Sequence, residues 1–133
     1  MKILSFAAAL WLAALVSVTV SAQTGKSVND GVYTAAQADR GDKVFNATCT
    51  TCHDTARFTG KEFLSVWTGQ PIHALFEHVN TTMPEDNPGS LKPEQYADIL
   101  AFFLKLNGYP EGAEELPASP EALKTIRFDN KTK

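Results

Sequence analysis

The stretch Asn46-Ala47-Thr48-Cys49-Thr50-Thr51-Cys52-His53-Asp54-Thr55 holds the only two cysteines of this 133-residue chain, and a histidine directly follows the second. Three side chains that can bind a metal or form a covalent bond therefore lie close together in sequence. Their spacing is compatible with a Cys49–Cys52 disulfide, with a zinc site, and with covalent attachment of a haem through C-x-x-C-H. The compartment and the rest of the chain decide between these uses.

The N-terminal sequence has the features of a secretory signal peptide. Lys2 precedes an apolar run that closes at the small residues Val20-Ser21-Ala22, the pattern of an exported protein. We expect cleavage after Ala22, so that residues 1–22 are the signal peptide and residues 23–133 reach a bacterial periplasm. The alternative is an uncleaved membrane anchor, because the apolar run is long enough to be one.

The composition is that of an ordinary globular protein. The exported chain would have 111 residues, with 11 Lys and Arg against 15 Asp and Glu and a formal charge of −4. This length forms one domain, and the charge argues against a nucleic-acid partner, since phosphate binding needs clustered positive charge. We expect flexible ends at residues 23–30 and after Phe128.

The sequence around the cysteines favours haem over the other two uses. A thioredoxin-like disulfide belongs to a βαβ unit, and the chain lacks the alternating β-branched runs that build a sheet. Zinc would need a fourth ligand, which no second C-x-x-C or His-x-His supplies. In haem attachment, Cys49 and Cys52 add to the two vinyl groups on one porphyrin edge, and His53 reaches the iron. Export agrees with this use, because c-type maturation takes place on the exported side of the membrane.

Met83, the single methionine of the exported chain, is the candidate for the other face of the iron. It lies in Asn80–Ser90 (NTTMPEDNPGS), a stretch rich in Thr, Pro, Asn and Gly where a core methionine is not expected. Pro84 biases Met83 towards an extended backbone, which would hold its sulfur in place. The competing iron ligands are His73 and His78.

Three further side chains are candidates for contacts around the haem. Trp67 could donate its indole N–H to a haem propionate, or it could be a plain core residue. Thr81 or Thr82 could donate a hydrogen bond to the methionine sulfur or to a propionate.

Helical periodicity predicts an all-α fold. One helix begins after Thr34 as N-cap, with Gln37 at N3 completing a capping box. A second begins with Pro93 at N1 and ends before Gly108, although Lys92 is a poor N-cap. Shorter helices are predicted over residues 60–67, over residues 71–80 and after Ser119, and Leu123 and Ile126 should hold the last one on the body.

The two long helices are expected to cross. Gly41 inside the first helix costs about 1 kcal/mol relative to Ala, a cost that close approach of another helix would explain. The predicted crossing places Gly41 and Phe45 against the apolar stripe of the second helix, which consists of Tyr96, Ile99, Leu100 and Phe103.

Together these features resemble a class I, mitochondrial-type cytochrome c over about residues 31–110, with residues 111–133 as a C-terminal extension of a single domain. The features are the C-x-x-C-H motif, Gly41 and Phe45, Met83-Pro84 and the aromatic C-terminal helix. The sequence from Thr82 to Gly108 is similar to small haem domains associated with bacterial quinoprotein dehydrogenases. The resemblance implies the class I cytochrome c fold, with N- and C-terminal helices crossing and short helices around one covalent haem c. It also implies His53 and Met83 as the iron ligands.

The resemblance further implies a one-electron carrier that is not an enzyme. Its partners would be redox proteins, with a dehydrogenase as donor and an oxidase or another cytochrome as acceptor, bound by a monomer in transient complexes outside the membrane. Asp54, Glu85 and Asp86 flank the proposed ligands where mitochondrial cytochromes carry lysines, so we expect docking to favour basic surfaces or to depend weakly on salt. The alternative function is a haem-based sensor of small ligands or a peroxidase-like enzyme with a labile distal ligand.

One departure from the family pattern concerns the proximal histidine. Mitochondrial cytochromes c have a proline-containing loop soon after C-x-x-C-H, and a carbonyl of that loop accepts the histidine N–H. Residues 54–63 (DTARFTGKEF) contain no proline. We still expect a backbone carbonyl between Asp54 and Gly60 to accept a hydrogen bond from His53.

Overall fold

The computed structural model describes residues 25–132, so the signal peptide expected at residues 1–22 lies outside the described residues. No helix in the described part of the chain is long and apolar enough to span a membrane. The predicted all-α fold is confirmed, with one short pair of strands added. The elements are β1 (Lys26–Ser27), η1 (Val28–Asp30), α1 (Ala35–Thr48), η2 (Thr55–Phe58), α2 (Gly60–Trp67), α3 (Ile72–Thr82), α4 (Pro93–Leu106), α5 (Pro120–Leu123) and β2 (Ile126–Arg127).

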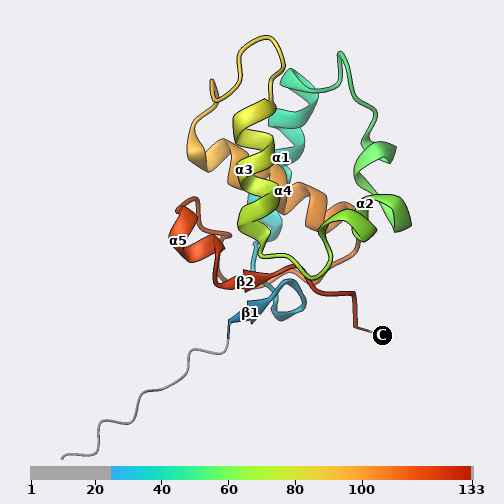
Figure 1. Ribbon diagram of the computed structural model, residues 1–133, viewed down its shortest axis with the longest axis vertical. Coiled ribbons are helices and arrows are strands. Elements are labelled where there is room, and N and C mark those ends of the chain that lie inside the picture. The colour runs from blue at the N-terminus through green and yellow to red at the C-terminus, as the bar shows by residue number, and fades with distance from the viewer. Residues whose placement is uncertain (1–24, 133) are drawn as a thin grey trace, which may run out of the picture.

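Helices α1 and α4 cross behind α3, as Figure 1 shows, and their crossing is the packed centre of the molecule. A Cβ placed on Gly41 would collide with the backbone carbonyl of Asp98, so the predicted close approach at this glycine is confirmed. Phe45 lies against Phe102 and Phe103, with ring centroids 5.6 and 5.8 Å away. Every residue of the predicted stripe on α4 is buried.

The C-terminal extension is fastened to α1 by polar contacts. Thr34 Oγ1 accepts the Gln37 N–H as predicted, at 3.1 Å. The predicted return bond, from the Thr34 backbone N–H to the Gln37 side chain, is wrong. The Gln37 side chain is 2% exposed and bonds to both backbone groups of Leu116, at 2.9 and 2.7 Å. Arg40 adds salt bridges to Asp98 and Glu115 at 2.9 and 2.8 Å, and this guanidinium lowers the pKa of Glu115.

The two ends of the described chain are hydrogen-bonded to each other, a contact that the prediction of flexible ends at residues 23–30 and after Phe128 did not include. Strands β1 and β2 pair in parallel at the base of the molecule. Val28 is fully buried, and Asn29 donates to the carbonyl of Asn130 at 2.8 Å. These segments are too short to show strand periodicity, and each is ordered by a partner about a hundred residues away. Leu123 and Ile126 are buried as predicted.

Helix α2 stands to one side of the crossing. Its bounds, Gly60–Trp67, are those that the sequence predicts, but Phe63 is its only buried residue. Val66 is 57% exposed, a large exposed fraction for an apolar side chain. The apolar side chains of α2 other than Phe63 are therefore not fully covered by a packed core.

Candidate cofactor site

A cavity of about 970 Å³ lies between α2, α3, α4 and the segment that follows α1. All five predicted cofactor-binding residues line it, and His78 lines it too. His73 does not, and its Nδ1 lies 3.9 Å from a carboxylate oxygen of Glu77. The five are Cys49, Cys52, His53, Trp67 and Met83.

The two cysteines lie in a tight turn that continues from α1. The backbone N–H groups of Cys52 and His53 both donate to the Cys49 carbonyl, at 3.2 and 2.9 Å. Both thiols are free, with Cys49 half-buried and Cys52 exposed. Burial raises the pKa of the Cys49 thiol, so this thiol stays protonated at neutral pH. No three His, Cys, Asp or Glu side chains within residues 25–132 come together as a metal site, so the zinc alternative gains no support from this geometry.

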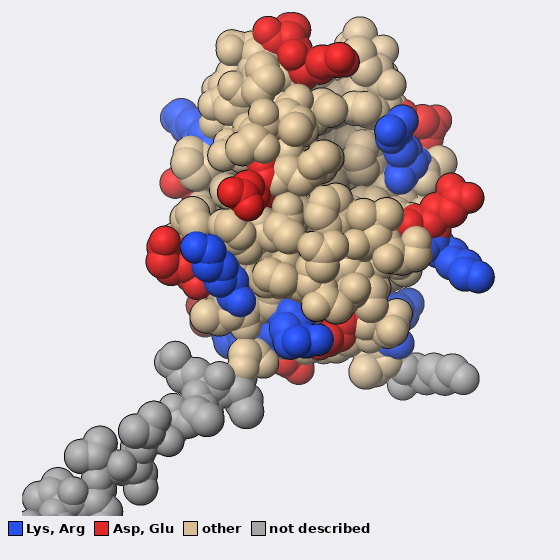
Figure 2. Space-filling model, in the orientation of Figure 1, with Lys and Arg blue, Asp and Glu red and all other residues tan. Residues whose placement is uncertain are grey.

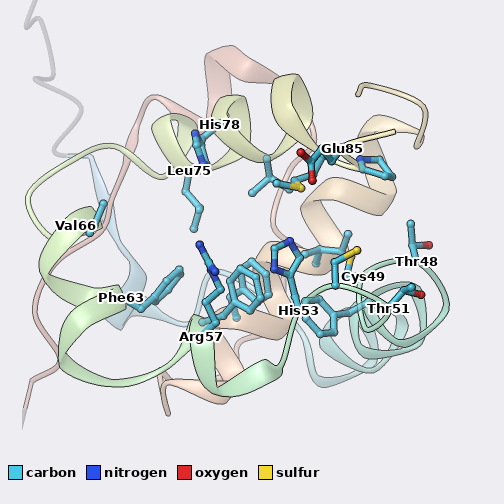
Figure 3. Close-up of a pocket in the computed structure, with 18 of the residues that line it drawn as sticks. Thr48, Cys49, Thr51, His53, Arg57, Phe63, Val66, Leu75, His78 and Glu85 are labelled. Atoms are coloured by element: carbon cyan, nitrogen blue, oxygen red, sulfur yellow. The ribbon is translucent and has the colours of Figure 1, made fainter. Parts of the chain in front are cut away.

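The His53 ring lies in the cavity, as Figure 3 shows. Its Nδ1 atom is buried and has no hydrogen-bond partner among the described residues, so the expected bond to a carbonyl of residues 54–60 is wrong. Several carbonyls in this segment have other donors. That of Ala56 accepts from the Thr59 N–H at 3.3 Å, and that of Phe58 accepts from Asn107 Nδ2 at 2.8 Å.

Packing orients His53 in place of a hydrogen bond. Its ring meets Phe58 edge-on, with centroids 5.5 Å apart and an interplanar angle of 82°. Phe58 in turn stacks on Phe103 of α4 at 4.4 Å. Asn107, at the C-terminus of α4, also accepts the Gly60 N–H at 3.0 Å, so α4 fixes the segment behind the histidine. Sequence reasoning missed Phe58 and Asn107, because their partners are more than forty residues away.

Met83 follows α3 directly, with an extended backbone (φ −128°, ψ 149°) as Pro84 predicts. Its N–H donates to Val79 O at 2.9 Å. The hydroxyls of Thr81 and Thr82 bond to carbonyls one turn earlier in α3, at 2.7 and 2.6 Å. The suggestion that these threonines bond the sulfur is therefore wrong in this structure, because helix geometry offers them closer acceptors.

Arg57 is a cavity residue that sequence reasoning missed. Figure 3 shows its guanidinium directed into the cavity towards Leu75, and no carboxylate of the described residues forms a salt bridge with it. A lone cation in the segment directly after C-x-x-C-H is the signal that could have pointed to Arg57.

Trp67 lies beside His78, with ring centroids 5.6 Å apart.

The residues present fit a covalently attached haem. Cofactor pockets typically measure about 300–1,000 Å³ and are lined mostly by apolar side chains with a few polar groups, and this cavity agrees on both counts. Two free thiols lie at one part of its wall, and a buried imidazole lacks a polar partner. The apolar wall includes Phe45, Phe58, Phe63, Val66, Leu75, Val79, Ile99 and Phe103.

On the face shown in Figure 2, the charged side chains lie mainly towards the outline of the molecule. Acidic side chains gather at the top, where the loops after α1 and α3 lie. Glu85 and Asp86, both exposed, line the cavity beside Met83. The rim next to the proposed distal ligand therefore carries negative charge.

Comparison with known proteins identifies a family. Residues 36–103, just over half of the chain, match the model of the family described as cytochrome C oxidase, cbb3-type, subunit III. The match runs from α1 into α4 and includes the C-x-x-C-H motif and Met83. No curated protein and no solved structure matches the chain.

Proposed function

The chain belongs to the family of cytochrome c oxidase, cbb3-type, subunit III and is a c-type cytochrome, and from this premise we propose that it is a periplasmic monohaem electron carrier. The observation that carries the proposal is that Cys49, Cys52, His53 and Met83 all line one cavity. Two thiols, an imidazole and a thioether form the donor set that attaches a haem and fills both axial positions.

Each residue has a distinct part in this proposal. Haem c, when bound, supplies an iron that gains and loses one electron. Cys49 and Cys52 would hold the porphyrin edge through thioether bonds, and His53 and Met83 would be the two axial ligands. Methionine with histidine raises the reduction potential, and a filled coordination shell leaves no free position for a substrate. The exposed Cys52 places the attached edge at the surface, where a partner can approach.

The partners we propose are a dehydrogenase as electron donor and an oxidase or another cytochrome as acceptor. The family match supports an oxidase as acceptor, because the family is named for a subunit of an oxidase. The quinoprotein dehydrogenase as donor rests on the sequence resemblance alone. Glu85 and Asp86 at the cavity rim support a partner with a basic docking surface, and such transient redox complexes have small interfaces.

The test is the visible spectrum of the exported protein, oxidised, reduced, and reduced under carbon monoxide. We expect sharp c-type bands that carbon monoxide leaves unchanged, and a methionine–iron charge-transfer band in the oxidised form. Met83→Ala is the matched reference, since it should lose that band and bind carbon monoxide promptly. If the unmodified protein binds carbon monoxide promptly, Met83 is not the distal ligand, and the sensor or peroxidase-like function replaces the carrier.

A further inference from the structure

The loop of residues 83–91 begins with Met83. Its first and last residues are both hydrogen-bonded to the hydroxyl of one tyrosine. Tyr96 of α4 is fully buried. Its hydroxyl donates to the carbonyl of Met83 at 2.8 Å and accepts the backbone N–H of Leu91 at 3.4 Å. One hydroxyl therefore joins the first and last residues of the loop to the packed centre of the molecule.

Few other contacts hold the backbone of Met83. Its carbonyl also accepts the Gly89 N–H, but at 3.4 Å, and the hydroxyls of Thr81 and Thr82 bond elsewhere. Tyr96 is the one side chain of the described residues that hydrogen-bonds the backbone of Met83. The ring itself is fixed, because it packs edge-on against Phe76 with centroids 6.2 Å apart. The fixed hydroxyl of Tyr96 therefore donates to a loop whose first residue has few other hydrogen bonds.

We propose that Tyr96 is a positioning residue that keeps the sulfur of Met83 at the iron. The inference rests on the proposed function, in which Met83 is the distal ligand. Ligand-bearing loops open by local unfolding, and the population of the open form depends on the hydrogen bonds that opening breaks. Removing the Tyr96 hydroxyl removes the shorter of the bonds to the Met83 carbonyl and leaves Leu91 without an acceptor. We expect the open population to rise about tenfold, the usual worth of one or two hydrogen bonds.

The test is Tyr96→Phe in the haem-loaded protein, which keeps the ring and removes the hydroxyl. The readouts are the rate at which the reduced protein binds carbon monoxide and the alkaline pH at which the charge-transfer band disappears. We expect the rate to rise about tenfold and the band to disappear at lower pH. The matched control is Tyr33→Phe, because Tyr33 as a residue is as buried as Tyr96. Its hydroxyl donates to the Tyr109 carbonyl at 2.7 Å, at a site whose residues do not line the cavity.

The control separates positioning from general stability. Tyr33→Phe should lower the melting temperature about as much as Tyr96→Phe while leaving the carbon monoxide rate and the band unchanged. Equal effects of the two variants on the rate, or no effect of Tyr96→Phe, would overturn the inference and leave the proposed function standing. A charge-transfer band missing from the unmodified protein would overturn both.

Discussion

The packed half of the molecule, where α1 crosses α4, and the cavity half, formed by the segment that follows α1, by α2 and α3 and by the loop of residues 83–91, differ in what fills them. Nine residues of α4 are buried, against one in α2. The packed half is filled by the chain's own side chains. The cavity half surrounds about 970 Å³, so its apolar side chains need a cofactor to cover them. One sequence therefore encodes a core filled by its own side chains and an adjoining cavity that haem would fill, with Phe45, Ile99 and Phe103 of the core as part of the cavity wall.

The largest effect should follow from leaving the cavity empty. In the double variant Cys49→Ser/Cys52→Ser, no thioether can form, so the haem is not attached. The stabilisation that a cofactor gives by binding only the folded state is then lost. The expected loss is comparable to the whole folding free energy of a small domain, about 5–15 kcal/mol. We therefore expect no cooperative thermal transition by circular dichroism. Residual amide protection, if present, should lie in α1 and α4 and not in α2.

The control for this variant is unmodified chain produced without haem maturation, which keeps both cysteines. It should behave like the double variant, since the absent cofactor and not the substitution causes the loss. A cooperative transition in either apo-protein would mean that the cavity half is stable without haem, and the contrast between the two halves would be wrong.

The second prediction acts on the packed half alone. Without a close neighbour, Gly41→Ala in a helix would stabilise by about 1 kcal/mol. Here the new Cβ collides with the Asp98 carbonyl, so we expect destabilisation by about 3 kcal/mol, as in overpacked cores. Chemical denaturation measures the loss, and the haem spectrum at low denaturant should not change.

Ala47→Gly is the control for Gly41→Ala, because Ala47 is exposed on the same helix. It reports helix propensity by itself, with an expected loss of about 1 kcal/mol. Stabilisation of the protein by Gly41→Ala would show that α1 and α4 can separate without cost, contrary to the packed half described here.

The sequence predicted mainly the features that depend on neighbouring residues. The bounds of α2 and the N-cap at Thr34 follow from spacing and from backbone chemistry within one helix turn. The contact of Gly41 with Asp98 joins distant residues, but a glycine inside a helix is a local signal of close approach. The bond from Tyr96 to Met83 and the packing of Phe58 on Phe103 depend on how the elements meet in space. A local pattern cannot show which carbonyl a buried hydroxyl will reach, because that depends on the whole fold.

The same reasoning explains the wrong expectation for His53. The family pattern places a carbonyl beside the proximal histidine, but here the segment after the motif forms the short helix η2, which uses its own carbonyls. The His53 ring packs edge-on against Phe58 instead. The sequence showed that the proline was missing, but not that His53 would lie against Phe58.

The smallest effect on stability, and a distinct effect on redox behaviour, should come from Arg57 in the cavity half. The propionates of a haem lie on the porphyrin edge opposite the vinyl groups, so a cavity-lining guanidinium away from the cysteines can face them. Arg57→Gln removes a positive charge that would offset a propionate, and this favours the oxidised iron. We expect the reduction potential to fall by roughly tens of millivolts, the size of a partly screened charge interaction.

The free energy of unfolding of Arg57→Gln should stay within about 0.5 kcal/mol of that of the unmodified protein, because Arg57 is an exposed residue. Lys61→Gln is the matched control, since Lys61 is a cation of the neighbouring helix α2 that does not line the haem cavity. It should leave the potential close to that of the unmodified protein. If both variants lowered the potential equally, the effect would come from net charge, and the position of Arg57 in the cavity would have no redox role. A fall confined to Arg57→Gln would show that the cavity half can be tuned without disturbing the packed half, as the contrast between them requires.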